Sequence, residues 1–325
     1  MVDLRIDKKY KNVITQHINF FGTKDRIQKF FALEIEHFYE NLIKIGIMSV
    51  ICNVANTSFE VGMALFEMLQ ADEKCKEVNF PSMQSMLPSS TRLGMSASLP
   101  RTRIEMNEEF KTLVDGKERH DLKSREEVLK THNKNSKAIR FDEVKSINDA
   151  RKIIKGQEVV YMYHDQIDAR GDKLVTENEV FVACEEAIAE IYAMIKRLSS
   201  ANTTRFIITA DHGFIYKKEK LSASDKITAP KDSLKGRRYI ISEYDFAIEG
   251  TYKIPLGTIF RNQDRRNVYL PIGTDVFSIA GGGNNFVHGG SSLQEMIVAV
   301  DEKSLLEIFR HEVKMDLAFV DDYGF

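Results

Sequence analysis

Three stretches of the chain carry the residue types that bind divalent metal ions. The first is Asp211-His212, which follows the apolar run Phe206–Ile208. Such a run predicts a strand covered on both faces, and open α/β sheets bind ligands at the carboxyl ends of their strands. An aspartate beside a histidine suits zinc or manganese. Taken by itself, the pair is equally compatible with a capped turn whose histidine makes ordinary hydrogen bonds.

The second stretch, 164–173, follows another predicted strand, Glu158–Tyr163. Its carboxylates Asp168 and Asp172 flank a turn that contains Gly171, so both can converge on one point. Turns rich in aspartate and glycine are also common without any ligand. The position at the end of a strand, where the active face is expected, favours a binding role.

The third stretch, 281–293, contains His288 among glycines. It is not a phosphate-binding P-loop, because no lysine follows the glycines at the required spacing. Its notable feature is therefore the single imidazole.

A fourth stretch, Pro88–Met95, is rich in hydroxyl groups. Ser89, Ser90 or Thr91 can cap a helix that continues through Met95. A hydroxyl at the start of a helix faces free N–H groups and the positive end of the helix dipole, which favours an anionic nucleophile or a phosphate. A plain N-cap is the simpler alternative.

The elements that must position these residues alternate between strand and helix. A strand within 45–54 is followed by an amphipathic helix from about residue 60, and the clearest apolar stripe runs from Val180 to Leu198. Strand, helix and strand between 158 and 209 predict parallel strands joined by a right-handed crossover. The pattern predicts an α/β fold.

Other segments are expected to lie around this core. Residues 1–44 are interpreted as a helical lead-in, because residues 26–42 are apolar at roughly helical spacing. The segment 115–150 is dense in charged residues and is interpreted as a solvated insertion. Short alternating runs at 239–241 and 268–270 predict small strands on one edge.

Composition limits the function classes. The 325 residues carry a formal net charge of -2 and a pI of about 6.5, which argues against a general nucleic-acid or membrane-surface coat. Three cysteines make no disulfide framework and fit a reducing cytoplasm. No apolar run approaches the ~20 residues needed to span a bilayer. We therefore expect a cytoplasmic location and no membrane partner.

Taken together, these stretches resemble a known family. The segments Tyr163–Asp172, Thr209–Phe214 and Phe286–Glu295 strongly resemble the PglZ domain of the alkaline phosphatase superfamily, which occurs in BREX systems of bacterial defence against phage. Pro88–Met95 resembles its nucleophile segment. The resemblance covers roughly 45–300. Because full-length members are far longer, residues 1–44 and 301–325 are interpreted as remnants of flanking regions.

The resemblance implies an alkaline-phosphatase-like fold, a mostly parallel sheet with helices on both faces. It also implies two divalent metal ions, usually zinc, that bridge a phosphoryl group. One ion would be held by Asp211, His212 and the nucleophile Thr91. The other would be held by Asp168, Asp172 and His288.

The resemblance leaves the remaining site residues less defined. Charge on the transferred phosphoryl oxygens needs cationic help, and the candidates are Arg92, Arg237 and Arg238. His164 is a candidate metal ligand, a hydrogen-bond donor to a ligand, or a substrate contact.

The sequence departs from the family at the first strand. In the family this strand ends in an aspartate that bridges both metals, followed by a short Ala-Leu-Arg-Tyr-Glu-like run. Here the corresponding residue is Asn53, or Ala55 if the alignment slips by two. Either choice replaces a carboxylate by a weaker, neutral group, and the basic position of the run becomes Ser58.

Three functions are therefore considered. The first is a metal-dependent phosphatase or phosphodiesterase of a BREX-type system, acting on a nucleotide, a nucleic acid or a phosphoprotein alongside other defence proteins. The second is a catalytically silent interaction scaffold, suggested by Asn53. The third is direct nucleic-acid binding through the basic clusters at 117–140 and 217–238.

Overall fold

A computed structural model describes residues 48–304 of the chain, apart from 76, 81, 174, 219–225, 232 and 280–284. The predicted lead-in at 1–44 lies outside the described residues. So do most of the 301–325 tail and the glycines that precede His288.

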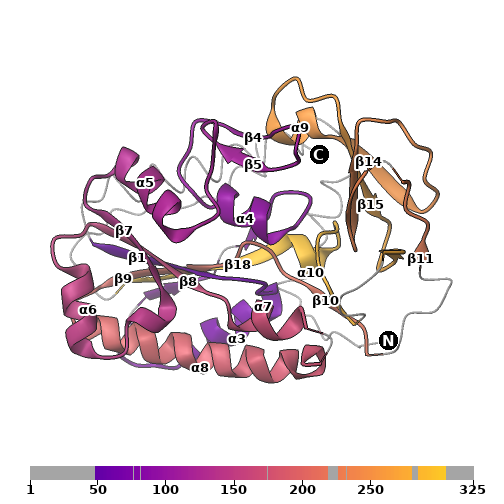
Figure 1. Cartoon of the computed structure of the whole chain (residues 1–325). Coiled ribbons are helices and arrows are strands. Elements are labelled where there is room, and N and C mark those ends of the chain that lie inside the picture. Colours follow the sequence, from indigo (N-terminus) through magenta and orange to yellow (C-terminus); the bar gives the residue numbers. More distant parts are fainter. Residues whose placement is uncertain are drawn as a thin grey trace, which may run out of the picture.

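The core of the described part is a seven-stranded sheet (Figure 1). Its strands are, in spatial order, β2 (Glu77–Asn79), β18 (Ile297–Ser304), β9 (Arg205–Thr209), β1 (Ser49–Val54), β8 (Val159–His164) and β7 (Ser136–Arg140), with β3 (Ser82–Gln84) also paired to β18. The four strands from β9 to β7 are parallel, and β18 runs antiparallel to β9. The carboxyl ends of β1, β8 and β9 therefore meet at one edge.

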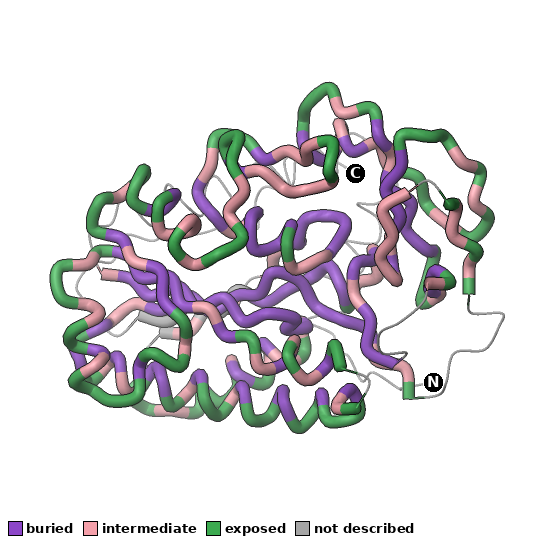
Figure 2. The backbone as a smooth tube through the Cα atoms, viewed as in Figure 1, coloured by how far each residue is buried: buried purple, intermediate pink, exposed green. Residues whose placement is uncertain are grey.

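Helices cover both faces of this sheet (Figure 1). One layer contains α3 (Phe59–Gln70), α6 (Ile147–Ile154) and α8 (Val180–Ser199), and the other contains α4 (Thr91–Ala97) and α5 (Leu122–His132). Alternation along β1 supplies both cores, because Val50 and Cys52 pack in the α8 layer while Ile51 packs in the opposite one. Figure 2 shows the central strands buried on both sides. The predicted α/β class is confirmed.

The stripe predicted between Val180 and Leu198 is the buried face of α8. The helix connects β8 to β9, but β1 lies between these two strands in the sheet. The crossover therefore passes over one strand rather than joining neighbours. The pattern of the chain predicts that the strands are parallel, whereas their spatial order depends on tertiary packing.

The segment 115–150 is more than the solvated insertion that was expected. It supplies α5, whose Val128 and Leu129 are buried, and the edge strand β7, which pairs in parallel with β8. An edge strand has fewer neighbours than a central strand, so β7 packs against the core through only two buried apolar side chains, Ala138 and Ile139. The charged residues occupy the outward faces of these elements.

A second, smaller sheet lies beside the core, as the short alternating runs predict. Its antiparallel order is β12 (Leu234–Gly236), β13 (Tyr239–Ser242), β15 (Asn267–Pro271) and β14 (Thr251–Pro255). Apolar residues of β13 and β15 pack on Leu93 and Ala97 of α4. The small sheet thereby supports the helix that carries the hydroxyl-rich stretch.

Short elements complete the described chain. They are β4 (Ile104–Met106), β5 (Thr112–Val114), β6 (Lys117–Glu118), η1 (Phe141–Glu143), α7 (Gln166–Gly171), η2 (Glu177–Glu179), β10 (Ile215–Tyr216), β11 (Lys226–Ile227), α9 (Leu256–Phe260), β16 (Val276–Phe277), β17 (Phe286–Val287) and α10 (Leu293–Met296). No helix among the described residues has the length and apolar character needed to cross a membrane.

Candidate metal centre

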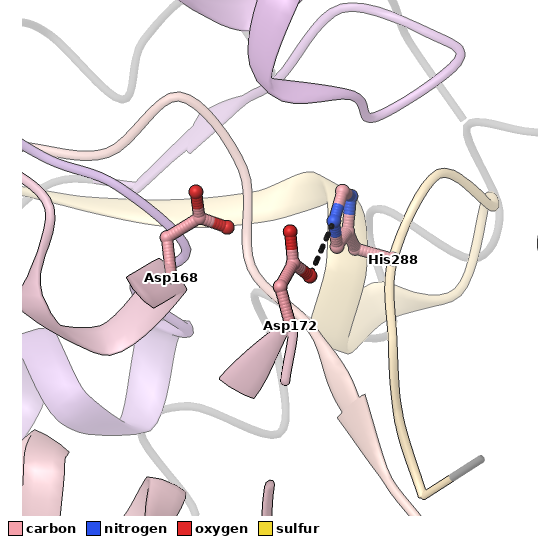
Figure 3. Close-up of side chains that lie close together, drawn as sticks. All are labelled: Asp168, Asp172 and His288. Atoms are coloured by element: carbon pink, nitrogen blue, oxygen red, sulfur yellow. Dashed lines mark ion pairs between the residues drawn. The ribbon is translucent and has the colours of Figure 1, made fainter. Parts of the chain in front are cut away.

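The short helix α7 brings two carboxylates to the strand edge. It begins directly after β8 and carries Asp168, while Asp172 is its C-cap residue. Residues four apart lie on the same face of a helix, so both side chains point the same way. His288 follows β17 and faces them (Figure 3). One ligand atom from each of the three residues lies within 4.8 Å of the others, and His288 Nε2 is 3.6 Å from Asp172 Oδ1.

The charges of Asp168, Asp172 and His288 favour a bound cation. Burial raises the pKa of Asp168 to about 7, and the negative charge of Asp172 adds to the effect. Burial alone would lower the pKa of His288, but the hydrogen bond and charge of Asp172 outweigh it and raise that pKa. A divalent ion would neutralise the carboxylates that burial disfavours.

A second group of donor atoms lies at the end of β9. Asp211 Oδ1 accepts the backbone N–H groups of Asn56 at 3.0 Å and of His212 at 2.9 Å. Asp211 Oδ2 is buried, and no described group hydrogen-bonds to it. Burial raises the pKa of Asp211 to about 6. A buried carboxylate oxygen without a hydrogen-bond donor fits a metal ligand.

His212 presents an unprotonated nitrogen to this oxygen. Its Nδ1–H donates to the Gly213 carbonyl at 2.9 Å, which leaves the lone pair on Nε2. Burial lowers the pKa of His212 to about 3, and nearby His288 lowers it further, so the ring is neutral. Nε2 lies 3.4 Å from Asp211 Oδ2 and 3.1 Å from Thr91 Oγ1. Ligand atoms around a tetrahedral ion with bonds of about 2.0–2.1 Å are about 3.4 Å apart, so both distances from Nε2 are compatible with ligands of one zinc-sized ion.

Thr91 reaches this position because α4 lies directly against Asp211. Thr91 is the first residue of α4, after the N-cap Ser90. A Cβ atom on Gly94, one turn further, would lie 2.5 Å from the Asp211 carbonyl oxygen and 2.8 Å from its Cβ. Only glycine allows this approach, so Gly94 sets the distance from the hydroxyl to His212.

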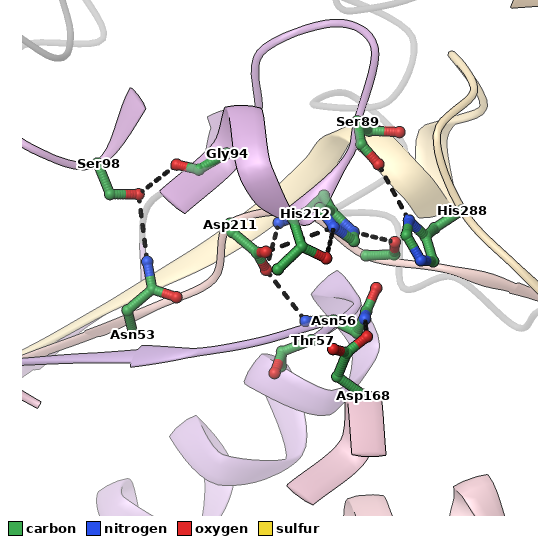
Figure 4. A network of polar contacts seen from close by, with 12 residues as sticks. Asn53, Asn56, Thr57, Ser89, Gly94, Ser98, Asp168, Asp211, His212 and His288 are labelled. Carbon is green, nitrogen blue, oxygen red and sulfur yellow. Dashed lines mark hydrogen bonds and ion pairs between the residues drawn. The ribbon is translucent and has the colours of Figure 1, made fainter. Parts of the chain in front are cut away.

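Asn56 connects the two groups of ligands (Figure 4). Its backbone N–H binds Asp211, and its side-chain amide donates to Asp168 Oδ1. Its φ of 56° lies in the left-handed region, which asparagine tolerates better than most residues. Asn56 Oδ1 is buried, and no described group hydrogen-bonds to it. The rings of His212 and His288 also stack, with centroids 4.5 Å apart, so the two groups form one centre.

The expected ligand Asn53 is not part of this centre. Its amide donates to Ser98 Oγ at 3.2 Å, on the α4 side of the sheet (Figure 4). Asn53 lies within β1, where alternation directs it toward that face. Asn56 lies past the end of the strand and reaches over the edge. The family resemblance pointed to Asn53, whereas the structure brings Asn56 to the carboxylates.

Two other candidate site residues, His164 and Arg238, pair with glutamates outside the metal centre. His164 is buried, and its Nε2 contacts Glu190 of α8 at 2.9 Å while its ring stands edge-on to Phe141. Arg238 has a fully buried guanidinium paired with Glu295, so it cannot contact a substrate. Both corrections have one cause, because sequence position near a strand end does not give the direction of a side chain.

The other two arginines differ in exposure. Arg92 follows Thr91 directly and is exposed, as a substrate contact requires. Arg237 is partly buried, and burial lowers its pKa while the charge of Glu177 opposes that change. Arg92 is therefore the better placed of the two beside the nucleophile candidate.

The chain is similar to several known proteins. A family model described as the BREX system PglZ alkaline phosphatase-like domain matches residues 48–301. Alkaline phosphatase-like protein PglZ of Bacillus cereus (strain H3081.97) is 36% identical over 247 residues, which cover 74% of this chain and 29% of that protein. Alkaline phosphatase-like protein BrxZ of Escherichia coli O9:H4 (strain HS) is 33% identical over 237 residues, covering 70% and 27%. The chain thus spans less than a third of the length of these relatives.

Solved structures show a similar fold. Murine ectonucleotide pyrophosphatase/phosphodiesterase 5 matches with a TM-score of 0.52 at 11% identity, over 78% of this chain and 87% of that one. The human protein of the same name gives 0.51 at 11% identity, with the same coverage. At this identity the likeness concerns the fold alone.

Proposed function

The chain belongs to the family of BREX system PglZ alkaline phosphatase-like domains, and from this premise we propose that it is a metal-dependent phosphoryl-transfer hydrolase with Thr91 as its nucleophile. The observation that carries the proposal is the contact of Thr91 Oγ1 with the neutral Nε2 of His212 at 3.1 Å, where that nitrogen also lies 3.4 Å from the buried Asp211 Oδ2. A hydroxyl in contact with the lone pair of a neutral imidazole fits an activated nucleophile better than a plain helix cap.

The chain's residues would hold two divalent ions, zinc by resemblance to the family. One set is Asp168, Asp172 and His288, and the other is Asp211, His212 and Thr91. When bound, such ions lower the pKa of the threonine hydroxyl and neutralise charge on the phosphoryl group.

The reaction then follows from the positions of the side chains. The Thr91 hydroxyl would give its proton to water, and its oxygen would attack phosphorus while the bond to the leaving oxygen breaks with its electron pair. The leaving oxygen takes a proton from water. A second water hydrolyses the phosphothreonine, which releases phosphate or a phosphomonoester and restores the hydroxyl. Arg92, which is exposed and follows Thr91 in the chain, would bind the phosphoryl oxygens.

We propose a phosphodiester or nucleotide as the substrate rather than a phosphoprotein, by analogy with the name of one structure of similar fold. The murine neighbour is named a pyrophosphatase/phosphodiesterase, and its inactive threonine-to-alanine variant has been solved with AMP. We propose that this chain acts in the cytoplasm on a nucleotide or nucleic acid, together with other proteins of a BREX system. The three cysteines, all buried and free of disulfides, are compatible with a reducing compartment.

The proposal is tested by metal analysis and by hydrolysis of bis(p-nitrophenyl) phosphate. The wild-type protein should hold two divalent ions per chain and turn the diester over, and Thr91→Ala should abolish turnover. Thr131→Ala is a matched control, because that threonine lies on α5 and bonds only to the Glu127 carbonyl. A metal-loaded Thr91→Ala protein with the wild-type rate would exclude Thr91 from the mechanism.

The second candidate function is an interaction scaffold without turnover. The observation that favours it is the neutral amide of Asn56 between Asp168 and Asp211, where a carboxylate would bind dications more strongly. A silent scaffold would hold one ion or none and would not hydrolyse the diester. Elemental analysis of the wild-type protein separates the two candidates.

The third candidate, direct nucleic-acid binding through 117–140, has less support. Two of its basic residues are already ion-paired, Lys130 with Glu126 and Arg140 with Asp165. A gel-shift assay with duplex DNA over a range of salt concentrations would test it. Binding that weakens steeply with salt would revive this candidate.

A further inference from the structure

The Ser292–Glu295 segment has the sequence of a capping box, yet Glu295 does far more than cap α10. Ser292 is the N-cap residue, and Glu295 accepts its backbone N–H at 3.2 Å. Glutamates in capping boxes usually lie at the surface. Here both Glu295 and its partner Arg238 have fully buried side chains. A helix of one turn needs no buried arginine, so the pair calls for another explanation.

We infer that Glu295 is a positioning residue that orients the imidazoles of both metal subsites, with Arg238 neutralising its charge. The inference rests on the metal centre proposed above. It assigns to one buried residue the hydrogen bonds that support both rings, through its carboxylate on the His288 side and its backbone carbonyl on the His212 side.

A series of hydrogen bonds that includes Gly290 connects Glu295 to His288. Glu295 Oε1 accepts the Gly290 N–H at 2.8 Å, and the Gly290 carbonyl accepts Ser89 Oγ–H at 2.6 Å. The Ser89 carbonyl in turn accepts Nδ1–H of His288 at 3.4 Å (Figure 4). These bonds fix both ends of the loop that bears the ring. They leave His288 Nε2 directed at Asp172.

Glycine is required on this path for steric reasons. Gly289 has a φ of 111°, which other residues rarely adopt. A Cβ atom on Gly290 would lie 2.6 Å from Glu295 Oε2 and 2.7 Å from Arg238 Nη2. The backbone of the loop therefore rests directly on the ion pair.

The path to His212 is shorter. The backbone carbonyl of Glu295 accepts the Gly213 N–H at 2.8 Å, and the Gly213 carbonyl accepts Nδ1–H of His212 at 2.9 Å. A Cβ atom on Gly213 would lie 2.1 Å from the Gln294 carbonyl oxygen, so the two segments are in contact. Gly213 thus links α10 to His212: its N–H binds the end of α10, and its carbonyl holds the proton of His212 on Nδ1.

Arg238 connects Glu295 to the segment that follows β15 of the small sheet. Its Nε and Nη2 bind Glu295 at 3.1 and 2.8 Å, Nη2 also binds the Gly273 carbonyl at 2.7 Å, and Nη1 binds the Asp275 carbonyl. A buried carboxylate without this partner would be strongly disfavoured. Groups that hold metal-binding imidazoles typically change metal affinity 10–100-fold when they are removed.

The experiment compares Glu295→Gln with the control Asp264→Asn. Asp264 pairs with Arg266 in a second ion pair with little exposure, whose other partners are the Met106 and Asn107 carbonyls. Zn²⁺ binding to the full chain is measured by competition dialysis. We expect Glu295→Gln to weaken both sites about 10–100-fold and Asp264→Asn to leave them unchanged. Wild-type affinities in Glu295→Gln would overturn the inference.

Two additions keep the test decisive. If Glu295→Gln does not fold, the double variant Arg238→Met/Glu295→Gln removes the pair without leaving an unpaired buried charge, and the same loss of Zn²⁺ affinity is expected. Ring-nitrogen NMR of the metal-free protein, at a pH where both rings are neutral, should show both histidines as fixed Nδ1–H tautomers in the wild type and as averaged tautomers in the variant. Unchanged tautomers would also overturn the inference.

These readouts also separate this inference from the proposed function. A wild-type protein that binds no Zn²⁺ would contradict the metal-dependent hydrolase and leave the tautomer experiment as the test of Glu295. A wild-type protein that binds two ions, with a variant that binds them equally well, would contradict only the role of Glu295.

Discussion

At the scale of single residues, the centre depends on which asparagine of the first strand and its loop meets the carboxylates. Asn56, and not Asn53, contacts Asp168 and Asp211. A half-turn of its amide about the Cβ–Cγ bond would exchange Oδ1 and Nδ2, and would turn the oxygen toward Asp168. Asn56 can therefore serve as a neutral ligand between the two ions.

The first prediction is that Asn56→Asp tightens zinc binding. The new carboxylate would add a negative charge between Asp168 and Asp211, which repels them in the metal-free protein and attracts the ions when they bind. We expect at least about tenfold higher Zn²⁺ affinity by dialysis, together with a lower melting temperature in EDTA. The matched control Asn53→Asp should leave the affinity unchanged, and a gain there instead would restore Asn53 as the ligand.

The second prediction concerns pH. The pKa of Asp168 is raised from 3.8 to about 7 in the folded protein, so its contribution to stability is complete below about pH 4 and is lost as the pH rises through 7. With EDTA present, the free energy of unfolding of the wild type relative to Asp168→Asn should fall between pH 4 and 7, by at most about 4 kcal/mol. Denaturant titrations at pH 4, 6 and 8 measure this difference, and a flat difference would contradict the raised pKa.

At the scale of elements, the site is built by short segments packed closely on long ones. Helix α7 has only one and a half turns, but it places both carboxylates because they stand four residues apart. Helix α4 approaches Asp211 through Gly94. The long helix α8 and the strands provide the rigid frame that keeps these distances fixed.

The third prediction compares Gly94 and Gly62, two glycines at which an added Cβ atom would clash with a neighbouring residue. Gly94→Ala should push α4 away from Asp211 and move Thr91 from His212, so turnover should fall about 100-fold or more. Gly62→Ala is the matched control, because its new Cβ would meet Ala299 at 2.3 Å in the core instead. Both variants should lose stability in thermal melts, but only Gly94→Ala should lose turnover relative to its folded fraction. Equal losses of turnover would show that α4 does not set the geometry.

At the scale of the whole molecule, the candidate ligands come from segments far apart in the chain. Thr91 belongs to α4, Asp168 to α7, Asp211 follows β9, and His288 follows β17. Ions bound by all of them would link the central sheet to the loop held by the small sheet. Metal binding should therefore stabilise the folded state as a whole.

The fourth prediction is that Zn²⁺ raises the unfolding free energy. At free Zn²⁺ about 1,000 times its dissociation constant, each occupied site should add about 4 kcal/mol relative to EDTA. Differential scanning calorimetry with and without Zn²⁺ measures the gain. His288→Ala should remove the part that belongs to the Asp168 and Asp172 subsite, and a full gain in that variant would place the ions elsewhere.

The amino-acid sequence by itself determined the repeating elements and the set of chemical groups. The apolar runs predicted β1, β8 and β9, and the stripes predicted α3 and α8, because periodicity is a local property of the chain. The motifs around Thr91, Asp168, Asp172, Asp211, His212 and His288 identified candidates that the fold brings to one edge, since parallel strands end on the same side.

Tertiary structure alone decided which way side chains point and what surrounds them. Asn53 and His164 lie within strands, and the face each one meets depends on the packing of the whole sheet. Arg238 was a candidate substrate contact because charge on the phosphoryl oxygens needs a cation, yet its side chain is fully buried and paired with Glu295. Asn56 joins the centre because its left-handed backbone carries the chain over the sheet edge. These outcomes depend on contacts between residues distant in sequence, which no local pattern records.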